Sequence, residues 1–170
     1  MTTERRDPAF DADERTSLEG WLEFHRQTLA MKCAGLTDAQ LRIASVEPSP
    51  LSLMGLVRHM ADVERSWYRR VLVGEAVPPL YWSEEDPDAE FHLNETDTWQ
   101  ATYEIWQAEI EAARRNAADF GLDDLSKGRS RHTGEQINLR WIHTHMIEEY
   151  ARHNGHADLI RERIDGATGD

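Results

Sequence analysis

Apolar residues recur at three- and four-residue spacings in several segments of the chain, which is the pattern of amphipathic helices. The first segment, residues 14–34, ends before Gly35, a residue suited to the left-handed position after a helix. The sequence TDAQ at residues 37–40 forms a capping box and predicts a short helical turn. A second long helix is expected to begin after Ser52 and to end at Gly74.

Two further helices are expected in the second half of the chain. The third begins near Thr96 or Thr98, and its apolar stripe continues until Gly121 stops it. The last helix starts after Asn138 and reaches about Ile164. Because no segment alternates between apolar and polar residues with period two, the sequence predicts an all-α four-helix bundle. The interior of such a bundle is where metal and cofactor sites are built.

The expected helices leave one long connection and two chain ends without periodicity. Residues 74–97 carry three prolines and many acidic side chains, and long connections of this kind are often functional. Residues 1–12 and 166–170 are expected to be mobile. At 170 residues the chain is long enough to bury its own core, so we expect a single domain spanning residues 1–170.

Charge and cysteine content narrow the range of partners and compartments. Acidic residues outnumber basic ones by 32 to 19, which gives a formal net charge of −13. This charge repels nucleic acid and anionic lipid, so neither is expected as a partner. There is no long apolar segment of membrane-spanning length, and the only cysteine, Cys33, has no partner for a disulfide. We expect a cytoplasmic protein in which Cys33 is a buried apolar residue rather than a nucleophile.

A carboxylate and an imidazole share one face of the last helix. A count of about 100° per residue places His153 in the middle of the apolar stripe and Glu149 on its flank, whereas Glu148 points away. The two inward residues are four apart and therefore lie one turn above each other. Either they satisfy each other through an intrahelical hydrogen bond, or they supply two ligands to a shared metal ion.

A metal would need a third ligand from another helix, and His59 on the second helix is the candidate. It lies at the shoulder of the apolar stripe, as a residue facing an interhelical groove would. Glu64 falls inside the stripe and is expected either to accept a hydrogen bond from a ligating imidazole or to pair with an arginine. The chain has neither the H-E-x-x-H nor the E-x-x-H motif, so we expect a site for one metal ion.

The other histidines are weaker candidates. His145 and His156 flank the Glu149 and His153 pair and are candidates for groups that support the metal ligands, as outer ligands or as acid and base residues. Solvent exposure is expected for the histidines in predicted connections or off the stripe, which are His92, His132 and His143.

The residues of the second and last helices resemble a known family. LSLMGLVRHMADVERSWYRRVLVGE and WIHTHMIEEYARHNGHADLIRER are similar to the corresponding helices of the DinB/YfiT-like superfamily of four-helix metalloenzymes. The resemblance implies that His59, Glu149 and His153 are metal ligands. Most members have histidine at the position of Glu149, and a glutamate here resembles the branch that includes mycothiol-dependent maleylpyruvate isomerase.

The same resemblance implies a chemistry. We expect zinc, with nickel or iron as alternatives, and a low-molecular-weight thiol such as mycothiol that the metal activates for S-transfer or isomerisation of a small-molecule substrate. The resemblance also implies a homodimer. Two alternative functions remain open: a hydrolase that uses metal-activated water, and a non-catalytic metal-binding or stress-associated bundle.

Overall fold

The computed structural model describes residues 5–131 and 133–169, and its regular elements are helical. The elements follow one another in the order α1 (Glu14–Cys33), α2 (Asp38–Leu41), α3 (Leu53–Glu64), η1 (Arg65–Leu72), α4 (Trp99–Ala118) and α5 (Leu139–Asp165). Within the described ranges the extended pairing is limited to an isolated bridge between Leu125 and Asn138. The predicted all-α fold is confirmed.

Local capping residues fix where the helices begin. The side chains of Ser52, Thr98 and Asn138 each accept a hydrogen bond from a backbone N–H in the first turn of α3, α4 and α5. Thr37 and Gln40 form the predicted capping box at α2. A glycine in the left-handed conformation follows the end of α1, η1 and α5, with φ values of 77° at Gly35, 72° at Gly74 and 78° at Gly166.

The second long helix differs from the prediction in its second half. It continues past Glu64 as η1, a π-helical segment that ends at Leu72. A π-helix has a wider turn than an α-helix, so residues after Glu64 leave the 3.6-residue count used for the sequence. Tyr68 and Leu72 are buried as a result, with 1% and 0% of their surface exposed.

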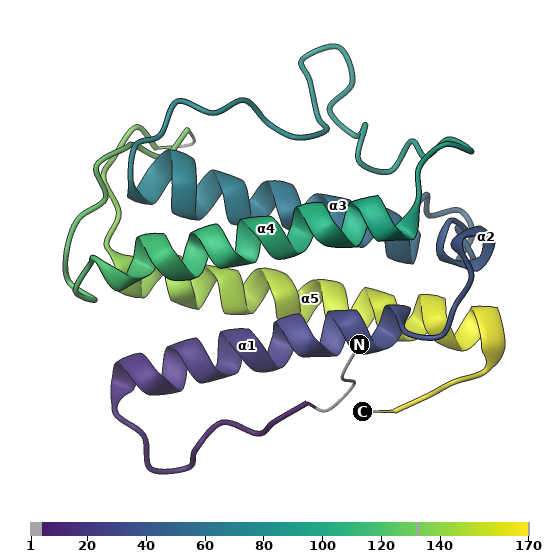
Figure 1. Ribbon diagram of the computed structural model, residues 1–170, viewed down its shortest axis with the longest axis horizontal. Helices are drawn as coiled ribbons and strands as arrows, with labels where there is room; N and C mark the ends of the chain where they lie inside the picture. The colour runs from purple at the N-terminus through teal and green to yellow at the C-terminus, as the bar shows by residue number, and fades with distance from the viewer. Residues whose placement is uncertain (1–4, 132, 170) are drawn as a thin grey trace.

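The four long helices lie side by side around one core (Figure 1). Helix α1 packs mainly against α5, and α3 with η1 packs mainly against α4. Every long helix contributes apolar side chains with at most 2% of their surface exposed, among them Leu22, Leu29, Met60, Trp106, Ile110, Met146 and Ile160. The bundle therefore buries most of the positions that the sequence predicts to face the core.

The long connection runs across the outside of α3 before it enters α4 (Figure 1). Side chains of α3 hold it in place. The Asp62 carboxylate accepts the backbone N–H groups of Leu80 and Tyr81 at 2.6 and 3.0 Å, and Arg58 forms an ion pair with Asp97 at 3.0 Å. These contacts fix the connection over the outer surface of α3, where Glu90 is buried.

The described part of the N-terminal segment also contacts the bundle. The Arg5 guanidinium donates a hydrogen bond to the Thr28 hydroxyl at 3.2 Å, and the backbone N–H of Arg6 donates to the Gln27 side chain at 3.1 Å. Residues 5 and 6 therefore lie against α1, in a segment that the sequence predicts to be mobile. In the part of the chain that the structure describes, no helix has the length and apolar character needed to cross a membrane.

Candidate metal centre

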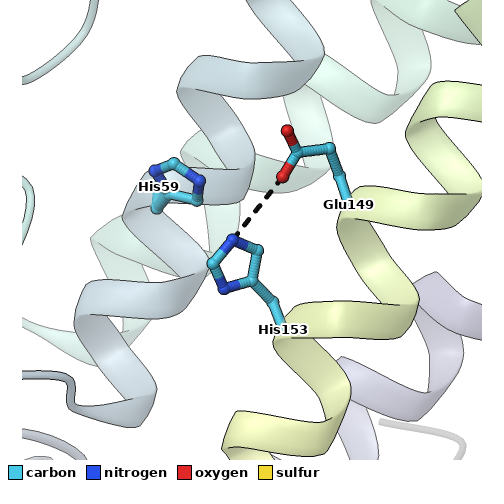
Figure 2. A group of neighbouring side chains, drawn as sticks. All are labelled: His59, Glu149 and His153. Carbon is cyan, nitrogen blue, oxygen red and sulfur yellow. Dashed lines mark ion pairs between the residues drawn. The ribbon is translucent and has the colours of Figure 1, made fainter.

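Three side chains meet between α3 and α5 (Figure 2). His59 comes from α3, while Glu149 and His153 come from successive turns of α5. One ligand atom of each lies within 4.8 Å of the others. His153 Nε2 and Glu149 Oε2 are 3.6 Å apart, and the rings of His59 and His153 meet edge to face with centroids 4.7 Å apart.

This arrangement fits a divalent metal. Tetrahedral zinc with ligand bonds of about 2.1 Å holds its ligand atoms about 3.4 Å apart. The separation of 3.6 Å between Glu149 and His153 is close to this value, and the ligand atom of His59 lies within 4.8 Å of both. Two imidazoles with one carboxylate form a donor set typical of catalytic zinc, which leaves a coordination position for a small molecule.

A buried carboxylate orients the His59 ring. His59 Nδ1 lies 3.1 Å from Glu90 Oε1, so the imidazole N–H donates to Glu90 and its Nε2 remains available as a ligand. Burial raises the pKa of Glu90, but the hydrogen bond and charge of His59, a backbone hydrogen bond and the charge of Arg58 together lower it below its ordinary value. Glu90 therefore occupies the supporting position that the sequence analysis considered for Glu64. Its location in the aperiodic connection gave no sequence signal for this role.

The two flanking histidines, His145 and His156, lie against the Glu149 and His153 pair. His156 Nδ1 lies 3.3 Å from His153 Nδ1, which places the Nε2 atom of His153 toward Glu149. His145 Nε2 lies 3.4 Å from Glu149 Oε1, the carboxylate oxygen not paired with His153. The neighbouring His153 imidazole lowers the pKa of Glu149 against the opposing effect of burial. Glu149 is thus an anion oriented from both sides.

A second group of potential ligands overlaps the first. His145, Glu148 and Glu149 also bring one ligand atom each within 4.8 Å of the others. Glu148 is exposed, however, and its carboxylate pairs with Arg152 at 2.8 Å, so the second group lacks the interhelical enclosure of the first. The cluster of His59, Glu149 and His153 is the better metal centre.

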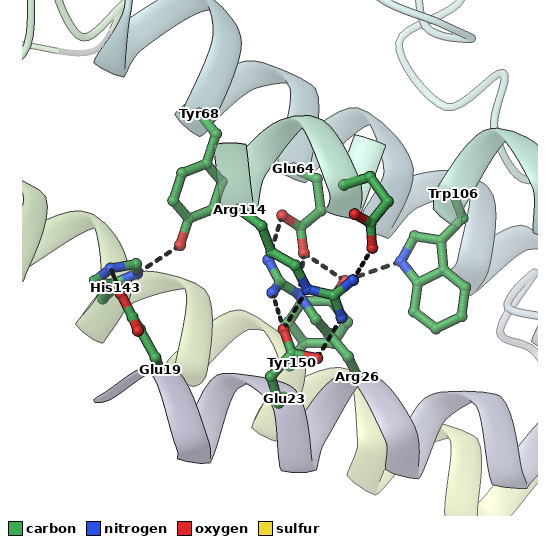
Figure 3. Close-up of polar contacts among 10 residues, drawn as sticks. Glu19, Glu23, Arg26, Glu64, Tyr68, Trp106, Arg114, His143 and Tyr150 are labelled. Carbon is green, nitrogen blue, oxygen red and sulfur yellow. Dashed lines mark hydrogen bonds and ion pairs between the residues drawn. The ribbon is translucent and has the colours of Figure 1, made fainter. Parts of the chain in front are cut away.

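Glu64 forms a different structure in the centre of the bundle (Figure 3). Arg26 donates two hydrogen bonds to its carboxylate, at 2.8 and 2.7 Å. The Tyr150 hydroxyl donates a third at 2.8 Å, and the Trp106 indole N–H donates to Tyr150 at 2.9 Å. Of the two roles considered for Glu64, pairing with an arginine is the one found, because its lone pairs are directed toward Arg26 and Tyr150 rather than toward a ligand histidine.

The remaining histidines divide into exposed and buried side chains. His92 is exposed, as predicted, and pairs with Asp86 at 2.7 Å. The expectation for His143 is wrong, because it is 2% exposed and its Nδ1 lies 2.8 Å from the Tyr68 hydroxyl. The π-helical turns direct Tyr68 toward α5, which supplies a polar partner for a histidine outside the apolar stripe. His132 lies outside the described residues.

The candidate metal centre adjoins a large pocket. His59 and Glu149 line one part of a cavity of about 1040 Å³ between η1, the long connection and the loop that precedes α5. Trp67 and Trp141 form an aromatic wall beside Glu149, with ring centroids 5.1 Å apart. A ligand atom held near His59 and Glu149 would therefore extend into a space large enough for a substantial organic molecule.

The four-helix bundle and the His, Glu, His cluster beside a pocket place this chain among helical proteins with a candidate metal-dependent active site. A family model described as Mycothiol-S-transferase matches residues 17–166, and the chain belongs to this family. The family lies within the DinB/YfiT-like superfamily, so the resemblance found in the sequence is confirmed. No curated protein sequence matched the chain.

Proposed function

We propose that the protein is a metal-dependent transferase that uses mycothiol as its thiol substrate. The observation that carries the proposal is the convergence of His59, Glu149 and His153, of which His59 and Glu149 line the pocket. Membership of the mycothiol S-transferase family supports a thiol rather than another nucleophile. The three side chains are the proposed ligands of a divalent ion, with zinc favoured over nickel or iron by the donor set.

The site's own residues would prepare the reaction by orienting donors and excluding water. Glu90 holds the His59 ring with Nε2 toward the site, and His156 holds the His153 ring. A bound divalent ion lowers the pKa of a coordinated thiol and so favours the thiolate. In S-transfer the thiol loses its proton, its sulfur bonds to an electrophilic atom of the acceptor, and the leaving group departs with the electron pair of the broken bond.

The pocket supports a catalytic role over a purely structural one. A structural zinc site is closed by four protein ligands, whereas this cluster offers three and faces a cavity of about 1040 Å³. Isomerisation of a thiol-reactive substrate would begin with the same attack and remains within the proposal. Hydrolysis would use the same three ligands, and the family assignment makes it the less favoured reaction.

The setting of the enzyme is part of the same proposal. Cys33 is a free, buried cysteine, which suits the reducing cytoplasm in which a low-molecular-weight thiol is available. We further propose that residues 1–170 act as one domain and form the homodimer implied by the resemblance. Sedimentation equilibrium would test the dimer, since a monomer mass at micromolar concentration would contradict it.

Metal analysis and a transfer assay test the proposal together. Protein purified without a nickel column should contain about one divalent ion per chain, and His153→Ala should lose it. His92→Ala is the control for loss of a histidine, because the exposed His92 pairs with Asp86 rather than with a residue of the candidate metal centre. Equal metal in wild-type protein and His153→Ala would refute the ligand assignment.

The nucleophile is tested with mycothiol and 1-chloro-2,4-dinitrobenzene, whose aromatic carbon accepts sulfur and releases chloride. Zinc-loaded protein should accelerate formation of the coloured thioether, and chelation followed by zinc addition should remove and restore the activity. Cobalt-substituted protein should develop a thiolate charge-transfer band when mycothiol is added. If no band appears and only ester hydrolysis is accelerated, the thiol is the wrong nucleophile.

A further inference from the structure

Three arginines gather at the end of the pocket formed by η1 and the loop before α5. Arg70 comes from η1, and Arg129 and Arg131 come from the loop. Arg129 donates to the Gly134 carbonyl at 2.9 Å, and the Arg131 guanidinium lies 4.6 Å from the centroid of the Trp82 ring. Over residues 5–131 and 133–169, none of the three forms an ion pair with a carboxylate. This is a notable arrangement in a chain with a net charge of −13.

The carboxylates of the same pocket are already engaged elsewhere. They are Asp62, Glu75, Glu90 and Glu149. Asp62 accepts two backbone N–H groups of the connection, and Glu75 forms an ion pair with Arg69 at 2.7 Å. Glu90 and Glu149 face the histidines of the metal centre. The charge that remains without a partner in the pocket is therefore positive, and it lies at the arginine end.

The fold holds the arginine loop against η1 by a close backbone contact. Gly128 N–H donates to the Val71 carbonyl at 2.9 Å, and Lys127 N–H donates to the Leu72 carbonyl at 2.8 Å. A Cβ atom at Gly128 would lie 2.3 Å from the Arg70 carbonyl oxygen, so a glycine is required for this approach. Docking of the loop against η1 places Arg129 and Arg131 in the lining of the same pocket as Arg70.

Aromatic rings occupy the space between the arginines and the metal centre. The ring of Trp141 stacks on His145 with centroids 4.9 Å apart, and Trp67 packs against both. Trp67, Trp82 and Trp141 all line the cavity. The side chain of Trp141 is 46% exposed and therefore accessible to a ligand. Flat aromatic walls of this kind bind planar, conjugated molecules through stacking and burial of apolar surface.

We infer that the acceptor substrate of this enzyme is a planar, conjugated molecule that carries a carboxylate, which Arg70 and Arg131 bind at the end of the pocket remote from the metal. The inference rests on the proposed function and specifies its substrate class. Arginine binds a carboxylate through paired, charge-assisted hydrogen bonds. The anionic end would fix the orientation of the acceptor and direct its electrophilic carbon toward His59 and Glu149.

A pair of acceptors that differ in charge tests the inference. 4-Chloro-3,5-dinitrobenzoate and 4-chloro-3,5-dinitrobenzamide both release chloride on attack by a thiol, but only the first is an anion. We expect kcat/KM with mycothiol, divided by the uncatalysed rate with the same thiol, to be about tenfold higher for the benzoate. Arg131→Gln and Arg70→Gln should each lower kcat/KM for the benzoate several-fold more than for the benzamide, chiefly through KM, and so remove most of this preference.

Lys127→Gln is the matched control, because Lys127 lies in the same loop but its ammonium lies 5.4 Å from the centroid of the Phe120 ring. It should retain the preference for the benzoate. Raising the salt concentration should weaken the preference in wild-type protein, since exposed charges are screened. Equal rates for the two acceptors, or an unchanged preference in both arginine variants, would overturn the inference.

A binding measurement separates this inference from the proposed function. 3,5-Dinitrobenzoate has no leaving group, and its binding is followed by quenching of the tryptophan fluorescence, with 3,5-dinitrobenzamide as the neutral comparison. Tighter binding of the benzoate that is lost in Arg131→Gln supports an anionic ligand even if no thiol transfer occurs. Transfer activity without any difference in binding or rate between the charged and neutral compounds leaves the proposed function intact and rejects the carboxylate.

Discussion

Replacement of Glu64 by leucine separates the two roles that the sequence allows for this residue. Glu64 is 0% exposed, and its carboxylate accepts two hydrogen bonds from Arg26 and one from Tyr150. Removing one partner of a buried ion pair typically costs about 3–5 kcal/mol, because the remaining charge is left without compensation. Arg26 keeps an ion pair with Glu23 at 2.6 Å, so we expect a loss near the lower limit, about 3 kcal/mol.

The assay is urea unfolding followed by circular dichroism. At a typical slope of about 1.5 kcal/mol per molar for a domain of this size, the loss shifts the unfolding midpoint downward by about 2 M. The double variant Arg26→Met and Glu64→Leu should recover part of this stability, because it removes both charges. The Tyr150 hydroxyl still lacks its acceptor, which leaves a deficit of about 1–3 kcal/mol.

Two results would refute this account. A double variant no more stable than Glu64→Leu would show that the ion pair is not the source of the loss. A folded Glu64→Leu protein that binds no metal at all, at a temperature where its secondary structure is intact, would return Glu64 to a role beside the metal. Metal binding that persists in that folded protein, weakened only as far as a small shift of the helices explains, would agree with the hydrogen bonds of Figure 3.

Three further outcomes are expected. Glu90→Gln should lower zinc affinity about 10- to 100-fold in a chelator competition, and Glu84→Gln in the same connection should not change it. Burial lowers the pKa of His143 from 6.5 to about 4 in the folded protein. As the pH falls, this histidine is therefore protonated in the unfolded chain before it is protonated in the folded one, which favours unfolding. Wild-type protein should therefore lose up to about 3 kcal/mol of stability between pH 6.5 and 4, relative to His143→Gln, in urea unfolding. Burial raises the pKa of Cys33 to about 12, so iodoacetamide at pH 8 should modify it only after urea unfolds the protein; rapid reaction in native protein would contradict this.

The parts of the fold that the sequence predicts are those set by nearby residues. Ser52 and Asn138 cap their helices because a cap joins atoms two or three residues apart. Glu149 was distinguished from Glu148 by an angular count that holds along a regular α-helix. His59, at the shoulder of its stripe, does face the groove between α3 and α5 where the other two ligands lie.

The parts that the sequence could not predict depend on contacts between distant segments. Glu90 reaches His59 across 31 positions from an aperiodic connection, so no periodicity could identify it. The burial of His143 depends on Tyr68, and the π-helical turns that place Tyr68 change the residue count after Glu64. The arginine end of the pocket likewise depends on the docking of Gly128 against a carbonyl of η1.

The central hydrogen-bond network explains how the metal centre retains its geometry on helices that could slide past one another. Glu64 on α3, Arg26 on α1, Tyr150 on α5 and Trp106 on α4 bond in one chain, so each of the four long helices contributes one member. Apolar packing alone tolerates small shifts along the helix axes, whereas directional buried bonds fix the register. Tyr150 directly follows Glu149 in the sequence, so the register of α3 against α5 also sets the distance from His59 to its partners. The double variant Arg26→Met and Glu64→Leu should therefore bind zinc less tightly than the wild-type protein, even under conditions where both proteins are fully folded.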